Sequence, residues 1–241
     1  MTAVEKQKVA GFLDLAGDYL SSGYRSEKKE HNFEDDAAPE TREKPVDEVE
    51  TIEKIAAEIR ACKRCPLSET RTKAAPGEGV AQPLVMVIGE GPGAEEDAQG
   101  RPFVGRAGQL LDKMLASIDL SRNRNCFIAN VVKCRPPGNR DPHPEERAAC
   151  AGFLKRQIIL LKPKFILVAG RVAAQTLLQT TESVNKLHGK FTEYTVDNVP
   201  FPLLVTYHPA ALLRDENYKR PAWEDLKLLR AKIDSLNDGG S

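Results

Sequence analysis

Four short apolar runs that alternate with helical stretches constrain the fold of this chain most strongly. The runs are rich in β-branched residues and cover residues 84–88, 127–132, 165–169 and 203–207. Each has the length and the continuous apolar character of a strand that is buried on both faces. Helical patterns cover residues 51–61, 105–118, 144–161, 171–178 and 221–233. Because the strands alternate with helices, we expect an α/β fold in which helices cover both faces of a parallel sheet.

The segments that follow the four predicted strands are where a site is expected. In an open parallel sheet, ligands bind beyond the carboxyl ends of the strands. These segments are GEGPGAEED from Gly89, NVVKCRPPGNRDPHP from Asn130, a Gly-Arg pair at 170–171 and HPAALLRD from His208. The sequence therefore directs the search for chemistry to four loops.

The first fifty residues differ in composition from the rest of the chain. Residues 21–50 are highly charged and have almost no aliphatic side chains, which is typical of a disordered linker. Before them, residues 9–20 have the spacing of one short amphipathic helix. We expect an acidic, largely disordered extension over residues 1–50 and a folded domain over residues 51–241. Residues 1–20 are then available to bind a protein partner or to pack on the chain's own domain.

Charge and hydropathy narrow the class of protein. No apolar run approaches the ~20 residues that a membrane span needs. No signal peptide opens the sequence, so we expect a cytoplasmic protein with no membrane partner. Residues 1–50 hold 7 basic and 13 acidic side chains, a net charge of −6, which leaves +6 for residues 51–241. This excess is compatible with binding to nucleic acid but does not require it.

Four of the five cysteines have a spacing that suits a metal centre. Cys62 and Cys65 form a CxxC pair, and Cys134 and Cys150 follow. A four-thiolate iron-sulfur cluster, a structural zinc site and coincidence all stay open on spacing alone. The wide second pair is unlike the paired knuckles of a zinc ribbon, and the odd cysteine count disfavours disulfides. Cys126 lies in an apolar run and is expected to be a buried strand residue.

Residues 89–94 formally match the dinucleotide-binding pattern G-x-G-x-x-G/A. We expect no nucleotide there, because the acidic residues that follow would repel phosphate. In addition, the next predicted helix begins only at residue 105, whereas a dinucleotide loop runs directly into its helix. A tight glycine turn without chemistry is the simpler alternative.

Two residues in these loops stand out as candidates. His208 directly follows the last predicted strand and precedes a proline. A lone histidine is more often a core residue, but this position favours an imidazole in the cleft. Phe103, between Arg101 and Arg106, can fill the core or form a base-stacking platform beside arginines that bind phosphate.

Taken together, the loops resemble those of a known family. CKRCPL, GEGPGAEED, GRPFVGRAGQLL, NVVKCRPPGNRDP and HPAALLR, in this order and with Cys150 after Cys134, are similar to the motifs of the family 4 uracil-DNA glycosylases. The resemblance covers residues 55–235. It implies a three-layer α/β/α sandwich with a central four-stranded parallel sheet, and a [4Fe-4S] cluster bound by the four cysteines. The sequence departs from the commonest family form at Ala94, where Glu is usual.

The resemblance also implies which residues act on uracil-containing DNA, single- or double-stranded. Catalytic roles are implied for His208, Glu90 and Asn130, and substrate-binding roles for Gly91, Glu96, Phe103, Asn130 and His208. His208 would donate a hydrogen bond to uracil O2 as negative charge develops, and Asn130 would distinguish uracil from cytosine. Because Gly91 stands where related glycosylases have an acid, no general base is obvious. Glu90 is the candidate that positions water, and Glu96 supports the loop.

Contacts to DNA are expected from the last loop and from nearby basic residues. The implied DNA-binding residues are Leu212, Leu213, Arg214, Arg106, Lys133 and Arg135. Leu212 is the first choice, and Leu213 the second, for an apolar wedge that fills the gap left by a flipped base. The cluster is expected to be structural. A non-catalytic or covalent uracil-DNA binding module is the alternative function, although the basic loop ending in histidine that marks the covalent binders is absent from the sequence.

Overall fold

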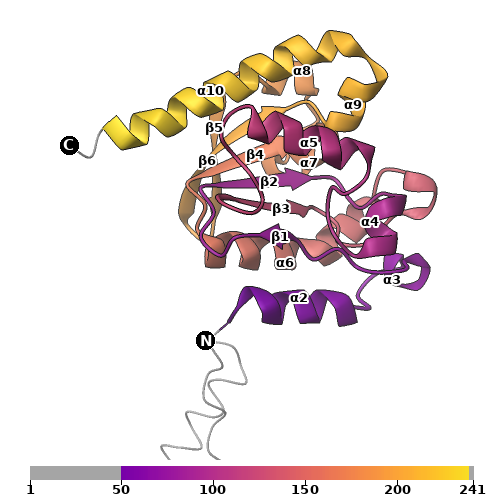
Figure 1. Ribbon diagram of the computed structural model, residues 1–241. Helices are drawn as coiled ribbons and strands as arrows, with labels where there is room; N and C mark the ends of the chain where they lie inside the picture. Colours follow the sequence, from indigo (N-terminus) through magenta and orange to yellow (C-terminus); the bar gives the residue numbers. More distant parts are fainter. Residues whose placement is uncertain (1–49, 239–241) are drawn as a thin grey trace, which may run out of the picture. The chain divides into compact units, whose positions relative to one another are not determined.

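The computed structural model describes residues 50–238, which form an α/β unit with helices on both faces of a central sheet (Figure 1). The predicted acidic extension lies outside the described residues. Its amphipathic helix and the proposed partner contact of residues 1–20 lie there too. The alternation of strands and helices along the sequence therefore predicted the class of fold correctly.

The sheet has six strands in the order β1-β3-β2-β4-β6-β5. Their bounds are β1 Glu78–Gly79, β2 Val85–Gly89, β3 Cys126–Asn130, β4 Phe165–Ala169, β5 Phe191–Val196 and β6 Val199–Thr206. The strands predicted from the sequence, β2, β3, β4 and β6, are adjacent and parallel. Antiparallel edge strands β1 and β5 extend them, so the expected four-stranded parallel sheet is in fact a six-stranded mixed sheet.

The two edge strands left no clear pattern in the sequence. β1 has two residues, too few for a period to show. β5 is mostly exposed or half-buried and pairs with β6. A two-residue turn joins the two strands, and its residues Asp197 and Asn198 have positive φ. By contrast, every residue of β2, β3 and β4 is buried, which is why these strands appear as continuous apolar runs.

The helices of the described residues lie close to the predicted ranges. Their bounds are α2 Ile52–Ala61, α3 Leu67–Thr70, α4 Ala94–Gln99, α5 Arg106–Ala116, α6 Pro144–Leu161, α7 Arg171–Leu178, α8 Val184–Leu187, α9 Pro209–Arg214 and α10 Lys219–Asp238, with short 3-10 helices η1 Pro137–Asn139 and η2 Glu216–Tyr218. The short helices α3, α4, α8 and α9 were not predicted, because each spans fewer than two turns and leaves little periodicity.

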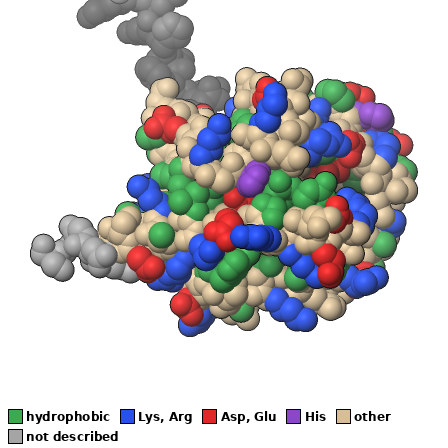
Figure 2. All heavy atoms as spheres, turned by 90° about the horizontal axis from the view of Figure 1, so that it is seen from above, with side chains coloured by type: hydrophobic (Ala, Val, Ile, Leu, Met, Phe, Trp, Pro, Cys, Tyr) green, Lys and Arg blue, Asp and Glu red, His purple; other side chains and the backbone are tan. Residues whose placement is uncertain are grey.

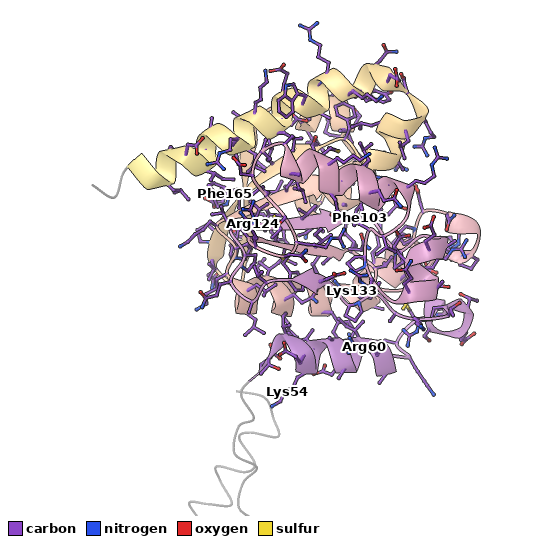
Figure 3. The ribbon with its side chains drawn as sticks, in the orientation of Figure 1. Lys54, Arg60, Phe103, Arg124, Lys133 and Phe165 are labelled. Carbon is purple, nitrogen blue, oxygen red and sulfur yellow. The ribbon has the colours of Figure 1, made fainter. Side chains whose placement is uncertain are left out.

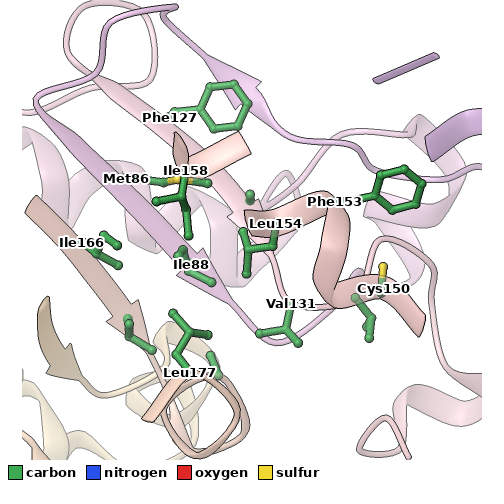
Figure 4. Packing of buried hydrophobic residues seen from close by; sticks show 14 of the residues in the cluster. Met86, Ile88, Phe127, Val131, Cys150, Phe153, Leu154, Ile158, Ile166 and Leu177 are labelled. Carbon is green, nitrogen blue, oxygen red and sulfur yellow. The ribbon is translucent and has the colours of Figure 1, made fainter. Parts of the chain in front are cut away.

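Alternate residues of the buried strands face two separate hydrophobic cores. On one face, Met86 and Ile88 of β2 pack with residues of α6 and α7, and Figure 4 shows Leu154 and Ile158 of α6 among them. On the other face, Val85 and Val87 pack with residues of α5 and α10. α2 lies outside α6, on the side of the sheet away from α10 (Figure 1). Cys126 begins β3 and is fully buried, as predicted.

The loop after β2 differs from the expectation. A helix was expected only from residue 105, yet α4 begins at Ala94, directly after the glycine loop. Gly93 is its N-cap, and the Gly93 N–H donates to Oε2 of Glu96 at 3.1 Å. The acidic first turn of α4 favours the helix and disfavours phosphate.

None of the helices in residues 50–238 is long and apolar enough to cross a membrane. The cytoplasmic location stays a prediction.

Candidate active site

A cleft of about 650 Å³ lies at the carboxyl ends of the parallel strands, where the topology predicted a site. Its walls come from the segments that follow β2, β3, β4 and β6, and from α8. The sequence-predicted residues in its lining are Glu90, Gly91, Glu96, Phe103, His208 and Arg214. All four loops singled out from the sequence therefore meet around one cavity.

Phe103 and His208 lie together in this cleft. Their ring centroids are 5.5 Å apart, with the ring planes tilted by 32°. Phe103 is buried and has φ +53°, an uncommon conformation for a residue with a side chain. Its ring also approaches the end of β2 so closely that a Cβ at Gly89 would be 2.5 Å from Cζ of Phe103. Only glycine at position 89 leaves room for the ring.

Asn130 also lies beside Gly89. The two residues pair in register at the ends of β3 and β2, and the same Cβ at position 89 would be 2.6 Å from Oδ1 of Asn130. Asn130 is 1% exposed, and neither side-chain Oδ1 nor Nδ2 has a hydrogen-bond partner among the described residues. Buried polar groups are nearly always paired, so this amide is unusual. An unpaired carboxamide therefore lies beside the Phe103 ring.

The protonation state of His208 follows from its place at the start of α9. The Ala210 N–H donates to Nδ1 of His208 at 3.1 Å, so this nitrogen has a free lone pair and a neutral ring has its proton on Nε2. Burial lowers the pKa of His208 to about 4, and the charge of Arg214 acts in the same direction. At neutral pH, His208 is therefore a neutral hydrogen-bond donor through Nε2.

Glu90 follows β2 directly and lines the same cleft. Burial raises the pKa of its carboxyl group to about 7, the Asp141 carboxylate adds to this, and Arg171 and Arg147 oppose it. Asp141 also lines the cleft and forms an ion pair with Arg171, with 2.5 Å between Oδ2 and Nη2. Gly91 offers no side chain in this region. Three carboxyl groups thus line the cleft, those of Glu90, Glu96 and Asp141, and the pKa of Glu90 lies near neutral pH.

Glu96 accepts hydrogen bonds from the start of α4 and from the two residues that follow Phe103. Its Oε1 accepts hydrogen bonds from the N–H groups of Val104 at 2.8 Å and Gly105 at 2.9 Å. Its Oε2 accepts from Gly93 N–H. The carboxylate thus ties the start of α4 to the segment that follows Phe103. These contacts fit the loop-supporting role expected for Glu96.

The preference for Leu212 as the wedge was wrong. Leu212 is 3% exposed and packs in the core cluster that includes α5 and α10, so its side chain is not presented at the surface. Leu213, the next residue of α9, is 44% exposed. Adjacent residues of a helix point about 100° apart, so burial of one leaves the other free to face outward. Arg214 follows Leu213 and lines the cleft.

The expected phosphate contact of Lys133 was also wrong. Lys133 lies inside the fold (Figure 3) and is 1% exposed. Its Nζ donates to the backbone oxygen of Asn130 at 2.9 Å and to Oε1 of Gln157 at 2.7 Å. Arg106 is exposed at the start of α5, and Arg135 donates to Oδ1 of Asn139, which lines the cleft. These two arginines stay candidates for DNA contact.

The net positive charge of residues 51–241 does not form a basic patch on the face that Figure 2 shows. On the face seen in Figure 2, lysine and arginine side chains alternate with acidic ones, and no continuous basic patch is visible there. Net charge therefore does not mark this face as a surface for nucleic acid.

The four cysteines of the predicted centre line a single small pocket. Cys62 and Cys65 are partly exposed, whereas Cys134 and Cys150 are buried. Burial raises the pKa of the Cys134 thiol, and a hydrogen bond from Arg71 acts in the opposite direction. Within residues 50–238, no group of three or more His, Cys, Asp or Glu side chains is placed to hold a metal ion. The sequence thus predicted which cysteines share a pocket, while the presence of a cluster stays a prediction.

Several residues of the cleft were missed from the sequence. Asp141 lies in the NRDP motif and Arg171 in the Gly-Arg pair, but neither was given a role. Asn185 comes from the unpredicted helix α8, and its Oδ1 accepts from the Tyr207 hydroxyl at 2.9 Å. The motif positions were a usable signal for the first two, whereas nothing in the local pattern indicated Asn185.

Comparison with known proteins agrees with this fold and site. Residues 76–227 match the Uracil DNA glycosylase superfamily. The mixed sheet, with its cleft at the carboxyl ends of the parallel strands, is therefore the scaffold of a member of this superfamily.

Relatives narrow this assignment. A type-4 uracil-DNA glycosylase of Sulfurisphaera tokodaii is 41% identical over 186 residues, which cover 76% of this chain and 84% of the relative. One from Pyrobaculum aerophilum is 42% identical over 181 residues (73% and 92%), and one from Thermotoga maritima is 38% identical over 187 residues (76% and 95%). The chain belongs to the type-4 uracil-DNA glycosylases.

Proposed function

We propose that the cleft binds a deoxyuridine flipped out of DNA and hydrolyses its N-glycosidic bond, which releases uracil and leaves an abasic site. Family membership makes the chain a DNA-repair glycosylase that removes uracil. The observation that most supports these residues as the site is the buried, unpaired amide of Asn130 beside Phe103, whose ring lies 5.5 Å from that of His208. An enclosed amide without a partner suits a ligand that supplies both a donor and an acceptor.

Recognition of uracil follows from the chemistry of that amide. Uracil offers an O4 acceptor and an N3–H donor, so a carboxamide can pair with both. Cytosine presents the reverse pattern at the same edge and would leave both atoms of Asn130 mismatched. Phe103 supplies a ring on which the flipped base can stack. Together the two residues select the base before any bond is broken.

Bond cleavage requires stabilisation of the leaving group. As C1′–N1 breaks, its electron pair moves into the uracil ring, and negative charge develops on O2. The Nε2–H of neutral His208 donates a hydrogen bond to that oxygen. Water adds its hydroxyl to C1′, and its proton passes to the Glu90 carboxylate. The residues of the chain thus stabilise both the departing base and the attacking water.

This role for Glu90 predicts a pH dependence. Below pH 7 its carboxyl group is increasingly protonated and cannot accept the proton of water, so kcat/KM should rise with pH and level off above about pH 7. Glu90→Gln should lower the rate and abolish this rise. Asp141→Asn removes a negative charge near Glu90 and should move the rise to lower pH. An unchanged pH profile in Glu90→Gln would exclude Glu90 as the titrating group.

The exposure of Leu213 predicts a difference between DNA substrates. Leu213→Ala should slow excision from double-stranded DNA on the order of tenfold and from single-stranded DNA much less, because only a duplex must be unstacked. Leu212→Ala is the matched control, expected to lower the free energy of unfolding by about 2–5 kcal/mol through a core cavity. Equal losses on both substrates in Leu213→Ala would rule out the wedge.

The proposal includes a [4Fe-4S] cluster bound by Cys62, Cys65, Cys134 and Cys150. The pocket that they share is lined by three basic residues and by no acidic residue, which suits an anionic centre. In a four-iron cluster each cysteine binds a different iron, so the sulfurs lie farther apart than the ligands of one ion. Bound there, the cluster would link three parts of the chain covalently: the CxxC segment between α2 and α3, the loop after β3, and α6.

Loss of one ligand should therefore remove the chromophore. Cys150→Ser should abolish the brown colour and the absorbance near ~400 nm and lower thermal stability, because the tie contributes folding free energy. Cys126→Ser is the matched control, since Cys126 lies in β3 and outside this pocket, and it should retain the colour. Iron analysis of both variants provides the measurement. Full iron content in Cys150→Ser would remove Cys150 from the ligand set.

The test of the function is strand scission at uracil. Purified protein is incubated with an oligonucleotide that contains a single uracil, and the product is treated with alkali. Cleavage at the uracil position shows that an abasic site was made. Binding without cleavage would instead support the alternative of a non-catalytic module, and a protein–DNA adduct that survives denaturation would support covalent binding.

A further inference from the structure

Arg71 makes three contacts at the pocket of the four cysteines. Its Nη1 donates to Sγ of Cys134 at 2.9 Å. Its Nη2 donates to the backbone oxygens of Arg60 at 2.7 Å and Cys62 at 2.9 Å. One guanidinium thus joins the end of α2, the first cysteine of the CxxC pair and a cysteine that lies more than sixty residues later in the chain.

The backbone next to Arg71 is itself anchored. The Thr72 N–H donates to both carboxylate oxygens of Asp97 in α4, at 2.9 and 3.1 Å. The Ala75 N–H donates to the backbone oxygen of Lys133, directly before Cys134. The segment that presents the guanidinium is therefore tied to the rest of the fold by contacts that do not involve the guanidinium.

The two other cations in the pocket lining have different partners. Arg64 lies over the Phe153 ring, with 3.9 Å between Cζ and the ring centroid. Lys133 bonds to Asn130 and Gln157 through Nζ. Among the side chains of residues 50–238 that line the pocket, Arg71 is the one with a hydrogen bond to a cysteine sulfur.

We infer that Arg71 is a positioning residue for the iron-sulfur centre: it holds the CxxC segment and Cys134 in place and stabilises the charge on the Cys134 sulfur. This inference depends on the cluster of the proposed function. A guanidinium is suited to the task because its planar fork can donate to several acceptors at once and stays charged at any working pH. Lysine has the charge but not the fork.

Two physical consequences follow from these contacts. A hydrogen bond to a ligand sulfur stabilises the more negative, reduced form of a cluster and so raises its reduction potential. The link between two ligand-bearing segments resists the separation that lets a chelator reach the iron. Removal of such outer contacts typically costs about 10- to 100-fold in metal affinity.

The experiment compares Arg71→Gln and Arg71→Lys with the unchanged protein, all purified and reconstituted without oxygen. The rate of iron release to an iron(II) chelator and the reduction potential of the cluster are measured. Arg71→Gln should release iron about 10- to 100-fold faster and have a more negative potential. Arg71→Lys should have a reduction potential between those of Arg71→Gln and the unchanged protein, but it should release iron almost as fast as Arg71→Gln. Arg64→Gln is the matched control: it removes a charge from the same pocket without removing a hydrogen bond to sulfur, so it should leave iron release unchanged and shift the potential less than Arg71→Gln does.

The possible results separate the inference from the cluster itself. Unchanged release and potential in Arg71→Gln, with a full cluster, would overturn the role of Arg71 and leave the cluster standing. If the protein without substitutions contains no iron or sulfide and does not absorb near ~400 nm, both the cluster and the role of Arg71 are overturned. Faster release with an unchanged potential would overturn the stabilisation of sulfur charge.

Discussion

Replacement of His208 with alanine should slow uracil release about 10²- to 10³-fold in single-turnover assays, while binding to uracil-containing DNA falls little. The reason is that the hydrogen bond from Nε2 strengthens only as charge develops on uracil O2, so its loss raises the barrier more than it weakens the ground state. Rates and affinity measured on the same oligonucleotide separate these two effects.

His188→Ala is the control for this prediction. His188 lies beside Tyr207 and pairs with the buried Asp225 at 3.1 Å, outside the lining of the cleft. Its removal should alter stability and leave the chemical step nearly unchanged. A near-normal single-turnover rate in His208→Ala would assign the leaving-group role to another residue.

The second large effect is expected at Asn130. Asn130→Asp is nearly isosteric, but it replaces the amide donor with an acceptor that faces uracil O4. A buried mismatched acceptor costs about 1–3 kcal/mol, which is about 5- to 150-fold in excision rate. Cytosine has an N4–H2 donor at that place, so the variant should gain a weak cytosine-excising activity, most readily in single-stranded or mispaired DNA.

Asn130→Ala serves as the matched control for base selection. It removes both side-chain functions and should lose uracil activity without any gain toward cytosine. Alkali treatment of oligonucleotides with one uracil or one cytosine measures both activities. If the Asp and Ala variants behave alike, the Asn130 side chain does not read the base.

Much of the fold and part of the site could be predicted from the sequence. The parallel strands were visible because burial on both faces makes β2 and β4 continuously apolar. His208 and Phe103 were found because they occur in loops at strand ends, and these loops converge on one cleft. The edge strands were not visible, because short or one-sided burial leaves no such run.

The errors concern side chains whose exposure is decided by distant parts of the chain. Lys133 lies in a basic loop, but its side chain is buried because Nζ donates a hydrogen bond to Gln157 of α6. Leu212 and Leu213 are chemically alike neighbours, and their difference arises only because α9 is a helix with one face against α5 and α10. Local composition contains no information about either partner.

The position of the cysteines in the chain has a consequence for biosynthesis. The pocket of the four cysteines brings Cys62 and Cys65 together with Cys150, which lies 88 residues after Cys62. At about 5–20 residues per second, a ribosome needs roughly 4–18 s to make that stretch. During this interval the first two thiols leave the exit tunnel without their partners, and any centre that needs all four can be completed only after α6 has emerged. Until α6 has emerged, the CxxC pair of the nascent chain is therefore exposed to oxidation and to binding of the wrong metal, because the rest of its pocket has not yet been made.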